Sequence, residues 1–287
     1  MAKPWLTIIG LGEDGPAGLS DASRDAVKQA EVIFGGPRHL ALIGAGSRGH
    51  DWPVPFSIDP VLAQKGRRVV VLASGDPFWF GAGGSLALRL SPGEWTCHPA
   101  PSTFGHAAAR LGWRMETTHC FGLHAAPFEL ILPVLSRGQR LICLMRDGAA
   151  VGALAQWLTA RGFGATDMTV LEAVGGPAER VRSGAARDHN LTDVGDLVAV
   201  GLAVAGGKAL PRAHVMPDAL FASDGVMTKR PIRALTLSAL APRPGEVLWD
   251  LGAGSGSVSI EWCLAAPGTT AHAVEQREGR AANIRSN

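Results

Sequence analysis

The stretch that decides the interpretation is Val247-Leu248-Trp249-Asp250-Leu251-Gly252-Ala253-Gly254-Ser255-Gly256-Ser257-Val258-Ser259-Ile260-Glu261-Trp262. It opens with an apolar run that ends in a carboxylate, continues with glycine at every second position, and closes with apolar residues at helical spacing. This order predicts a strand, a tight turn and a helix. Glycines in such a turn permit unusual backbone angles and let a ligand approach the bare backbone. The stretch therefore indicates a nucleotide-binding site.

Two details favour one nucleotide over another. The dinucleotide fingerprint requires glycine one position after the third glycine, and that position holds Ser257. The carboxylate before the turn would repel a pyrophosphate but suits a cationic amino-acid group. A second apolar run, Thr270 to Val274, predicts another strand, and the acid that follows it is placed for ribose hydroxyls. We therefore expect S-adenosylmethionine rather than NAD, with binding residues Asp250, Gly252, Gly254, Gly256 and Glu275.

Composition limits the class of protein. A chain of 287 residues, of which 46% are hydrophobic and 18% charged, is typical of a globular protein with about two or three domains. The net charge of +2 gives no reason to expect nucleic acid or an anionic membrane as partner. The four cysteines form no CxxC pair, and no apolar run approaches the ~20 residues of a membrane span. We expect a cytoplasmic protein with reduced thiols.

Strands and helices alternate along the rest of the chain, which predicts an α/β fold. The first predicted strand, Trp5 to Ile9, leads into a glycine loop, and Ser20 is the expected cap of the helix that follows. The continuous apolar run Val69 to Ala73 is typical of a parallel strand covered on both faces. It delivers Gly75-Asp76-Pro77, a rigid turn suited to aiming one carboxylate at a ligand. Further strands are predicted at Thr117–Cys120, Arg140–Met145, Met168–Ala173 and Leu197–Ala203.

Basic and metal-ligating side chains are the other candidates for function. Pro37 is expected to open a helix that brings Arg38 and His39 near the first loop. No metal is predicted, because the histidines and cysteine at 119–124 lack a fourth ligand at a recognisable spacing. A helix is expected from Thr228, its cap, with the apolar Ile232, Leu235 and Leu240 on one face. A solvated basic surface, which would also suit a substrate rich in carboxylates, is predicted at Arg180, Arg182, Arg187 and His189.

With these motifs in view, the N-terminal part resembles the tetrapyrrole methylase family. The shared features are the loop Gly10–Gly15, the Gly75-Asp76-Pro77 turn and the segment Pro101-Ser102-Thr103. Two further runs, Gly35–Leu40 and Leu171–Pro177, are similar to the decarboxylating precorrin-6B (precorrin-6Y) C5,15-methyltransferase subfamily. In that subfamily the methylase module is fused to a class I methyltransferase module, which the glycine turn resembles.

The resemblance implies a bilobed tetrapyrrole methylase fold, with two αβα lobes, followed by a partial Rossmann-like methyltransferase domain. We expect the methylase domain at residues 1–205 (lobes at about 1–113 and 114–205), a linker at 206–222, and the Rossmann-like S-adenosylmethionine domain at 223–287. A doubly wound methyltransferase domain needs about six or seven strands. The last domain is therefore expected to be incomplete.

The resemblance also implies the activity. We expect an S-adenosylmethionine-dependent methyltransferase of cobalamin biosynthesis that methylates C5 and C15 of precorrin-6B and decarboxylates the C12 acetate, with the C15 and decarboxylation half impaired. The alternatives are an NAD-dependent oxidoreductase and a truncated, non-catalytic remnant that binds tetrapyrrole or methyl donor. No general acid or base is assigned, and the sequence leaves homo-oligomer formation open. The implied methyl-donor residues of the first domain are Gly10, Gly12, Gly75, Asp76, Ser102, Thr103 and Met145, and the implied substrate residues are Arg38, His39 and Lys229.

Overall fold

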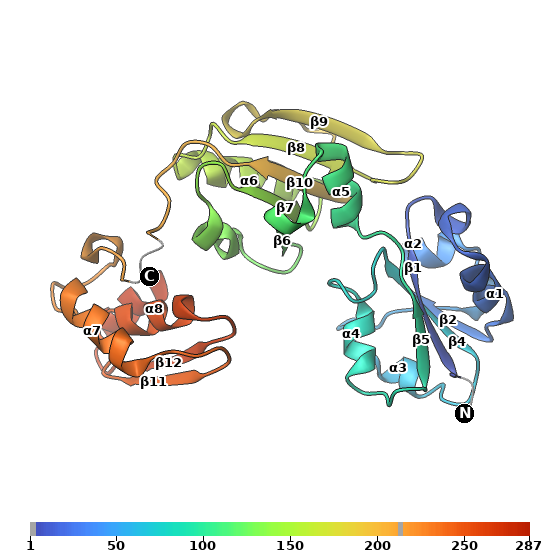
Figure 1. Cartoon of the computed structure of the whole chain (residues 1–287), viewed down its shortest axis with the longest axis horizontal. Helices are drawn as coiled ribbons and strands as arrows, with labels where there is room; N and C mark the ends of the chain where they lie inside the picture. The colour runs from blue at the N-terminus through green and yellow to red at the C-terminus, as the bar shows by residue number, and fades with distance from the viewer. Residues whose placement is uncertain (1–3, 212–214) are drawn as a thin grey trace. The chain divides into compact units, whose positions relative to one another are not determined.

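The computed structural model describes residues 4–211 and 215–287, so residues 212–214 of the predicted linker lie outside the described residues. The chain forms two compact units (Figure 1). The first comprises the chain up to Ile131 together with Ser136–Lys208, and the second comprises Leu132–Leu135 and Ala209–Asn287. The domain boundaries expected from the sequence stay predictions. None of the helices in the described residues is both long and apolar enough to cross a membrane.

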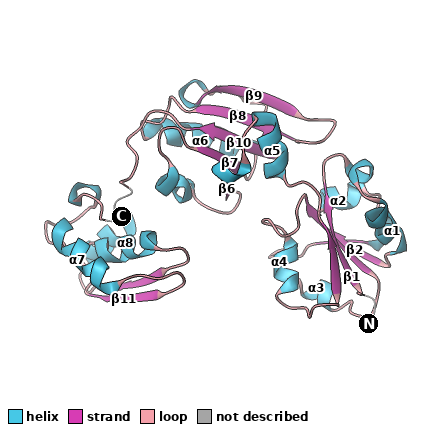
Figure 2. Ribbon diagram, in the orientation of Figure 1, coloured by secondary structure: helices cyan, strands magenta, loops and turns pink. Residues whose placement is uncertain are grey.

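The first sheet of the first unit has the strand order β3-β2-β4-β1-β5, and all of its pairings are parallel. Figure 2 draws its strands in magenta and labels β1 and β2. Both faces are buried, because alternate residues of β1 and β4 enter two separate apolar clusters. The predicted central strand at Val69–Ala73 is thereby confirmed. The strands are β1 (Leu6–Leu11), β2 (Val32–Gly35), β3 (Gly49–Asp51), β4 (Val69–Ser74) and β5 (Trp95–His98), and the helices are α1 (Asp21–Gln29), α2 (Pro37–Leu42), α3 (Asp59–Leu62) and α4 (Ala82–Ala87).

The second sheet of this unit is mixed, with the order β6-β7-β10-β8-β9. Only the pair β6–β7 is parallel among its described pairings. Helix α5 packs Phe104, Ala107 and Ala108 against this sheet. The strands are β6 (His119–Gly122), β7 (Arg140–Leu144), β8 (Asp167–Glu172), β9 (Arg180–Ala185) and β10 (Val198–Ala203), and the helices are α5 (Thr103–Leu111) and α6 (Gly148–Ala160).

Local capping follows the sequence closely in this unit. The Ser20 hydroxyl accepts a hydrogen bond from the Ser23 amide and begins α1, and the Ser102 hydroxyl does the same for the Gly105 amide at the start of α5. Pro37 occupies the first turn of α2, as predicted. Short 3₁₀ helices complete the connections at Gly15–Gly18, Gly46–Arg48, Met115–Thr117, Phe128–Val134 and Ala186–Asp188, with another in the second unit at Asp218–Leu220.

The second unit contains the predicted strand, turn and helix. Strands β11 (Val247–Leu251) and β12 (Thr270–Val274) pair in parallel, and the helices are α7 (Arg230–Leu240), α8 (Ser257–Ala265) and α9 (Glu278–Ser286). The apolar face that was expected on α7 is not its buried face, because Ile232 and Leu235 are exposed whereas Leu237 and Arg233 are buried. Thr228 is not the cap either, since Lys229 holds that position without a side-chain bond.

Candidate active site

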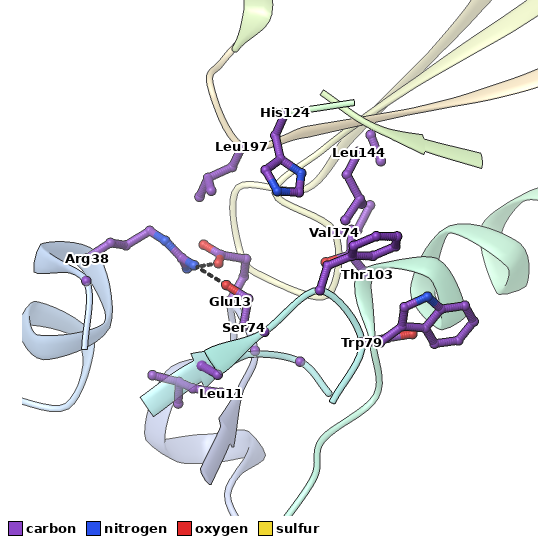
Figure 3. A pocket seen from close by; sticks show the side chains of 18 of the residues that line it. Leu11, Glu13, Arg38, Ser74, Trp79, Thr103, His124, Leu144, Val174 and Leu197 are labelled. Carbon is purple, nitrogen blue, oxygen red and sulfur yellow. Dashed lines mark hydrogen bonds and ion pairs between the residues drawn. The ribbon is translucent and has the colours of Figure 1, made fainter. Parts of the chain in front are cut away.

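A cavity of about 450 Å³ lies in the first unit (Figure 3). Residues that follow the carboxyl ends of β1, β2, β4, β7 and β8 line it, together with the start of α5 and the residues that lead into β10. In open α/β sheets, ligands bind outside the carboxyl ends of the strands. The volume falls in the range of about 300–1,000 Å³ that is typical of small-molecule sites.

Most of the residues predicted for this part of the chain meet at the cavity. Its lining includes the predicted residues Gly12, Arg38, His39, Gly75, Ser102, Thr103 and Met145. They come from both sheets of the unit, and Met145, at the end of β7, is buried. The roles assigned to them stay predictions, but their meeting in one place is a property of the fold.

Gly10 and Asp76 do not line the cavity. A Cβ atom on Gly10 would lie 1.9 Å from the Gly75 carbonyl oxygen and 2.4 Å from the Ala100 amide nitrogen. Glycine at position 10 therefore lets three backbone segments pack beneath the cavity. The Asp76 carboxylate accepts a hydrogen bond from the Phe78 amide at 2.9 Å, which folds the loop back on itself. In this structure both residues shape the loops of the site.

A charged cluster occupies one wall. The Arg38 guanidinium forms an ion pair with Glu13 and donates to the Ser74 hydroxyl at 3.2 Å (Figure 3). The same nitrogen that donates to Ser74, Nη2, lies 2.8 Å from Nε2 of His39, which in turn lies 3.0 Å from the Ser74 hydroxyl. Glu13 and Ser74 were not predicted. Glu13 stands in the same glycine loop as Gly12, so the loop was the signal that could have revealed it.

His39 is neutral at physiological pH. Burial first, and then the charge of Arg38, lowers the pKa of its imidazole from 6.5 to about 4. Because a guanidinium can only donate, the nitrogen facing Arg38 accepts and the proton resides on Nδ1. Nδ1 is buried and has no partner among the described residues. The wall therefore combines the ion pair of Arg38 and Glu13 with a neutral imidazole whose Nδ1 proton is buried.

The cavity segment that carries Asp196 is anchored by a buried carboxylate, that of Glu172. Glu172 accepts from Arg180 at 2.7 Å, from Arg182 at 2.9 Å and from the Gly195 amide at 2.9 Å. The Gly195 bond fixes the segment that carries Asp196, which lines the cavity. The interpretation of Arg180 and Arg182 as a solvated basic surface is therefore corrected. Both lie in strand β9 and are paired with acids. The sequence shows the charge of each arginine but not the acids that the fold brings next to it.

The glycine turn of the second unit has the backbone that its sequence predicted. Gly252, Gly254 and Gly256 have φ of 80°, 60° and 74°, the left-handed region that other residues avoid. A Cβ atom on either of the first two would meet nothing within 4 Å, so backbone conformation, not packing, requires glycine there.

Two acids that were predicted for this site, Asp250 and Glu275, hold that turn in place. Glu275 accepts from the amides of Gly254 and Arg277, each at 2.9 Å, and these bonds hold the pKa of the Glu275 carboxyl below its ordinary value. Asp250 accepts from the Ser259 hydroxyl at 2.6 Å. The Lys229 ammonium contacts the Gly225 carbonyl. No group of three or more His, Cys, Asp or Glu side chains in the described ranges is arranged to hold a metal.

Comparison with known proteins identifies the family. Residues 5–189 match the family described as tetrapyrrole (corrin/porphyrin) methylases. The chain belongs to this family. Residues 219–287 match a second family, described as a precorrin methyltransferase domain. As a tetrapyrrole methylase, the chain is an S-adenosylmethionine-dependent C-methyltransferase, which disfavours the alternative of an NAD-dependent oxidoreductase.

Individual relatives agree with the family. A precorrin-6Y C(5,15)-methyltransferase [decarboxylating] from Sinorhizobium sp is 46% identical over the whole chain, which covers 71% of that protein. A cobalt-precorrin-7 C(5)-methyltransferase from Salmonella typhimurium is 27% identical over 61% of the chain and 88% of its own length. Among solved structures, a precorrin-6Y methylase from Archaeoglobus fulgidus superimposes with a TM-score of 0.53 at 25% identity, covering 70% of this chain and 98% of the other. These similarities confirm the tetrapyrrole methylase fold.

The cavity of this methylase fits its methyl donor chemically. S-adenosylmethionine carries a cationic sulfonium and ammonium, and the carboxylates of Glu13 and Asp196 line the cavity. Its flat base requires apolar contacts, for which Leu72 and Val198 are available in the lining, and its hydroxyls require partners such as Thr103. When bound, S-adenosylmethionine supplies an electrophilic methyl group. These residues are the ones that would hold it in the first unit.

Proposed function

We propose that the first unit methylates C5 of precorrin-6B, also called precorrin-6Y, in cobalamin biosynthesis. The observation that carries the proposal is the gathering of both glycine loops, the start of α5 and the Arg38 cluster around one cavity. The Salmonella relative, whose name specifies C5, aligns over 61% of this chain, a length close to that of the first unit. The Sinorhizobium relative, whose name specifies both carbons, aligns over the entire chain.

We propose further that the second unit carries the methylation of C15 and the decarboxylation of the C12 acetate. The match of residues 219–287 to a precorrin methyltransferase domain supports this division of labour. The open glycine turn at Gly252 and Gly254, with an acid at the end of each strand, is where we expect a second methyl donor to bind. The impairment of this half that the sequence suggested has no support in the structure or in the comparisons.

The chain's own residues would act mainly by alignment. An enamine-like carbon of the reduced macrocycle is already a nucleophile, so no activated side chain is required. Holding that carbon in line with the transferred methyl group, in a cavity that excludes water, contributes up to about 7–11 kcal/mol. Around the cavity of the first unit, the loop pinned by Asp76 and the segment pinned by Glu172 provide rigid walls for such alignment.

Arg38 would fix the orientation of the macrocycle through its carboxylates. Its guanidinium lies at the cavity wall with its charge shared between Glu13 and neutral partners. A substrate carboxylate can join that network by accepting from Arg38, which lines the cavity. Charge-assisted bonds of this kind contribute about 1.5–3 kcal/mol each.

The test is steady-state kinetics of an Arg38→Ala variant with precorrin-6B. We expect the tetrapyrrole KM to rise by about tenfold or more, as the loss of one charge-assisted bond implies, while the dissociation constant of S-adenosylmethionine stays within about twofold. Arg24→Ala is the matched control, because Arg24 pairs with Asp21 on the outside of α1. An unchanged tetrapyrrole KM in the Arg38 variant would remove this residue from the substrate site.

Calorimetry separates the remaining alternatives. The methyltransferase predicts heat of binding with S-adenosylmethionine and none with NADH, and the NAD-dependent oxidoreductase predicts the reverse. A non-catalytic remnant would bind the methyl donor and the tetrapyrrole but leave the label on the donor after a single turnover. Labelled methyl on the macrocycle excludes the remnant.

A further inference from the structure

Phe80 combines a strained backbone with an exposed aromatic ring, and both are unfavourable in a protein without a bound ligand. Its φ of 58° places a bulky aromatic residue in the left-handed region, where residues other than glycine are uncommon. Its side chain is nevertheless 58% exposed, so burial does not offset the strain. Strained residues of this kind cluster at ligand sites, where the surrounding structure holds them in place. Phe80 lines the cavity.

The loop around Phe80 is rigidly held. The Pro77 carbonyl accepts from the Gly83 amide at 2.9 Å, and the Asp76 carbonyl accepts from the Trp79 amide at 3.1 Å. The Phe80 ring also approaches the end of β6, where a Cβ atom on Gly122 would lie 3.2 Å from it. The conformation of Phe80 is therefore set by its neighbours, and its ring is positioned before any ligand arrives.

Trp79 and Phe80 both pack on Phe104. The buried Phe104 ring lies 4.9 Å from the Trp79 ring and 5.9 Å from the Phe80 ring, measured between centroids. His124 meets Phe80 edge-on at 6.3 Å. Trp79 is 39% exposed and lines the same cavity (Figure 3). Two supported aromatic rings thus present accessible surface to the space that Arg38 lines from another wall.

We propose that Trp79 and Phe80 form an aromatic wall against which one face of the tetrapyrrole macrocycle packs. The inference rests on the proposed function, since it assigns the substrate surface of the same cavity. A flat conjugated ring with carboxylates at its edge matches an aromatic wall combined with the Arg38 charge. The adenine of the methyl donor is also flat, so the experiment has to separate adenine from the macrocycle.

The experiment compares ring-deleting and ring-retaining variants at position 80. Phe80→Leu should raise the precorrin-6B KM, and the dissociation constant of the stable polycarboxylate uroporphyrin, by about three- to tenfold, the worth of one aromatic contact. Phe80→Tyr should keep both within about twofold. Phe78→Leu is the matched control, because Phe78 is 47% exposed in the same loop but packs on Trp95 and does not line the cavity.

A structural role is tested separately by Phe80→Gly. Glycine relieves the backbone strain, so the melting temperature should not fall, while uroporphyrin binding, followed by absorbance, should weaken as in the leucine variant. Equal KM values for wild type and Phe80→Leu would overturn the proposal. So would a parallel loss of S-adenosylmethionine affinity, which would assign the ring to adenine. Ring-dependent uroporphyrin binding without methyl transfer by the wild type would support the wall and refute the proposed function.

Discussion

Replacement of Gly10 by alanine tests how the fold builds the cavity. The added Cβ would lie 1.9 Å and 2.4 Å from backbone atoms of Gly75 and Ala100, which cannot rotate away as a side chain could. Overpacking of this kind costs about 1–3 kcal/mol. For a unit of about 200 residues, 1 kcal/mol corresponds to roughly 2–4 °C, so the melting temperature should fall by about 2–12 °C. S-adenosylmethionine affinity should fall as well, because Gly75 lines the cavity.

Gly12→Ala is the informative companion. A Cβ atom there would lie 2.6 Å from Oδ1 of Asp14, the end of a side chain that can move. We expect thermal unfolding close to that of the wild type, with any effect confined to ligand affinity, measured by calorimetry. A Gly10→Ala protein that melts within about 1 °C of the wild type would refute the packing argument, and equal destabilisation of both variants would show that the two glycines cannot be told apart by their surroundings.

Two further predictions concern stability. Arg233 is fully buried and pairs with Glu261 at 2.7 Å. Arg233→Met should therefore destabilise the second unit by about 3–5 kcal/mol in urea unfolding, and adding Glu261→Leu should restore part of the loss. A loss below about 1 kcal/mol for the single variant would contradict this. His39 takes up a proton at a pKa of 6.5 when unfolded but only at about 4 when folded, so the unfolded state binds more protons between these values and stability falls as pH drops through that window. His39→Gln should flatten that part of the pH dependence of unfolding, and identical slopes would show that the imidazole is not buried as described.

Local patterns predicted the elements that dominate the fold. The apolar run at Val69–Ala73 and the spacing of Gly252, Gly254 and Gly256 specify a buried parallel strand and a tight turn by backbone physics alone. Strand β9 was not predicted because it lies at the sheet edge and is polar. Its arginines form ion pairs with acids that only the fold brings near. The face of α7 was misjudged because a buried Arg233 occupies the position that an apolar residue would normally take.

The candidate site was predictable in its parts but not in its connections. Loop motifs pointed to Gly75 and Ser102, since their sequence context is local. The ion pair of Arg38 with Glu13 joins helix α2 to the loop after β1, and the exposure of Phe80 depends on packing from α5 and β6. Such contacts arise from tertiary structure, so they cannot be predicted from local periodicity or spacing in the sequence.

The most direct test of the central claim is a single-turnover reaction with methyl-labelled S-adenosylmethionine and precorrin-6B, with the product assigned by NMR. We predict labelled methyl at C5, lost on replacement of residues that line the cavity of the first unit and retained in the Arg24→Ala control. The same spectrum measures transfer to C15 and loss of the C12 carboxyl group. Absence of label from the macrocycle, or label at C15 without label at C5, would contradict the account.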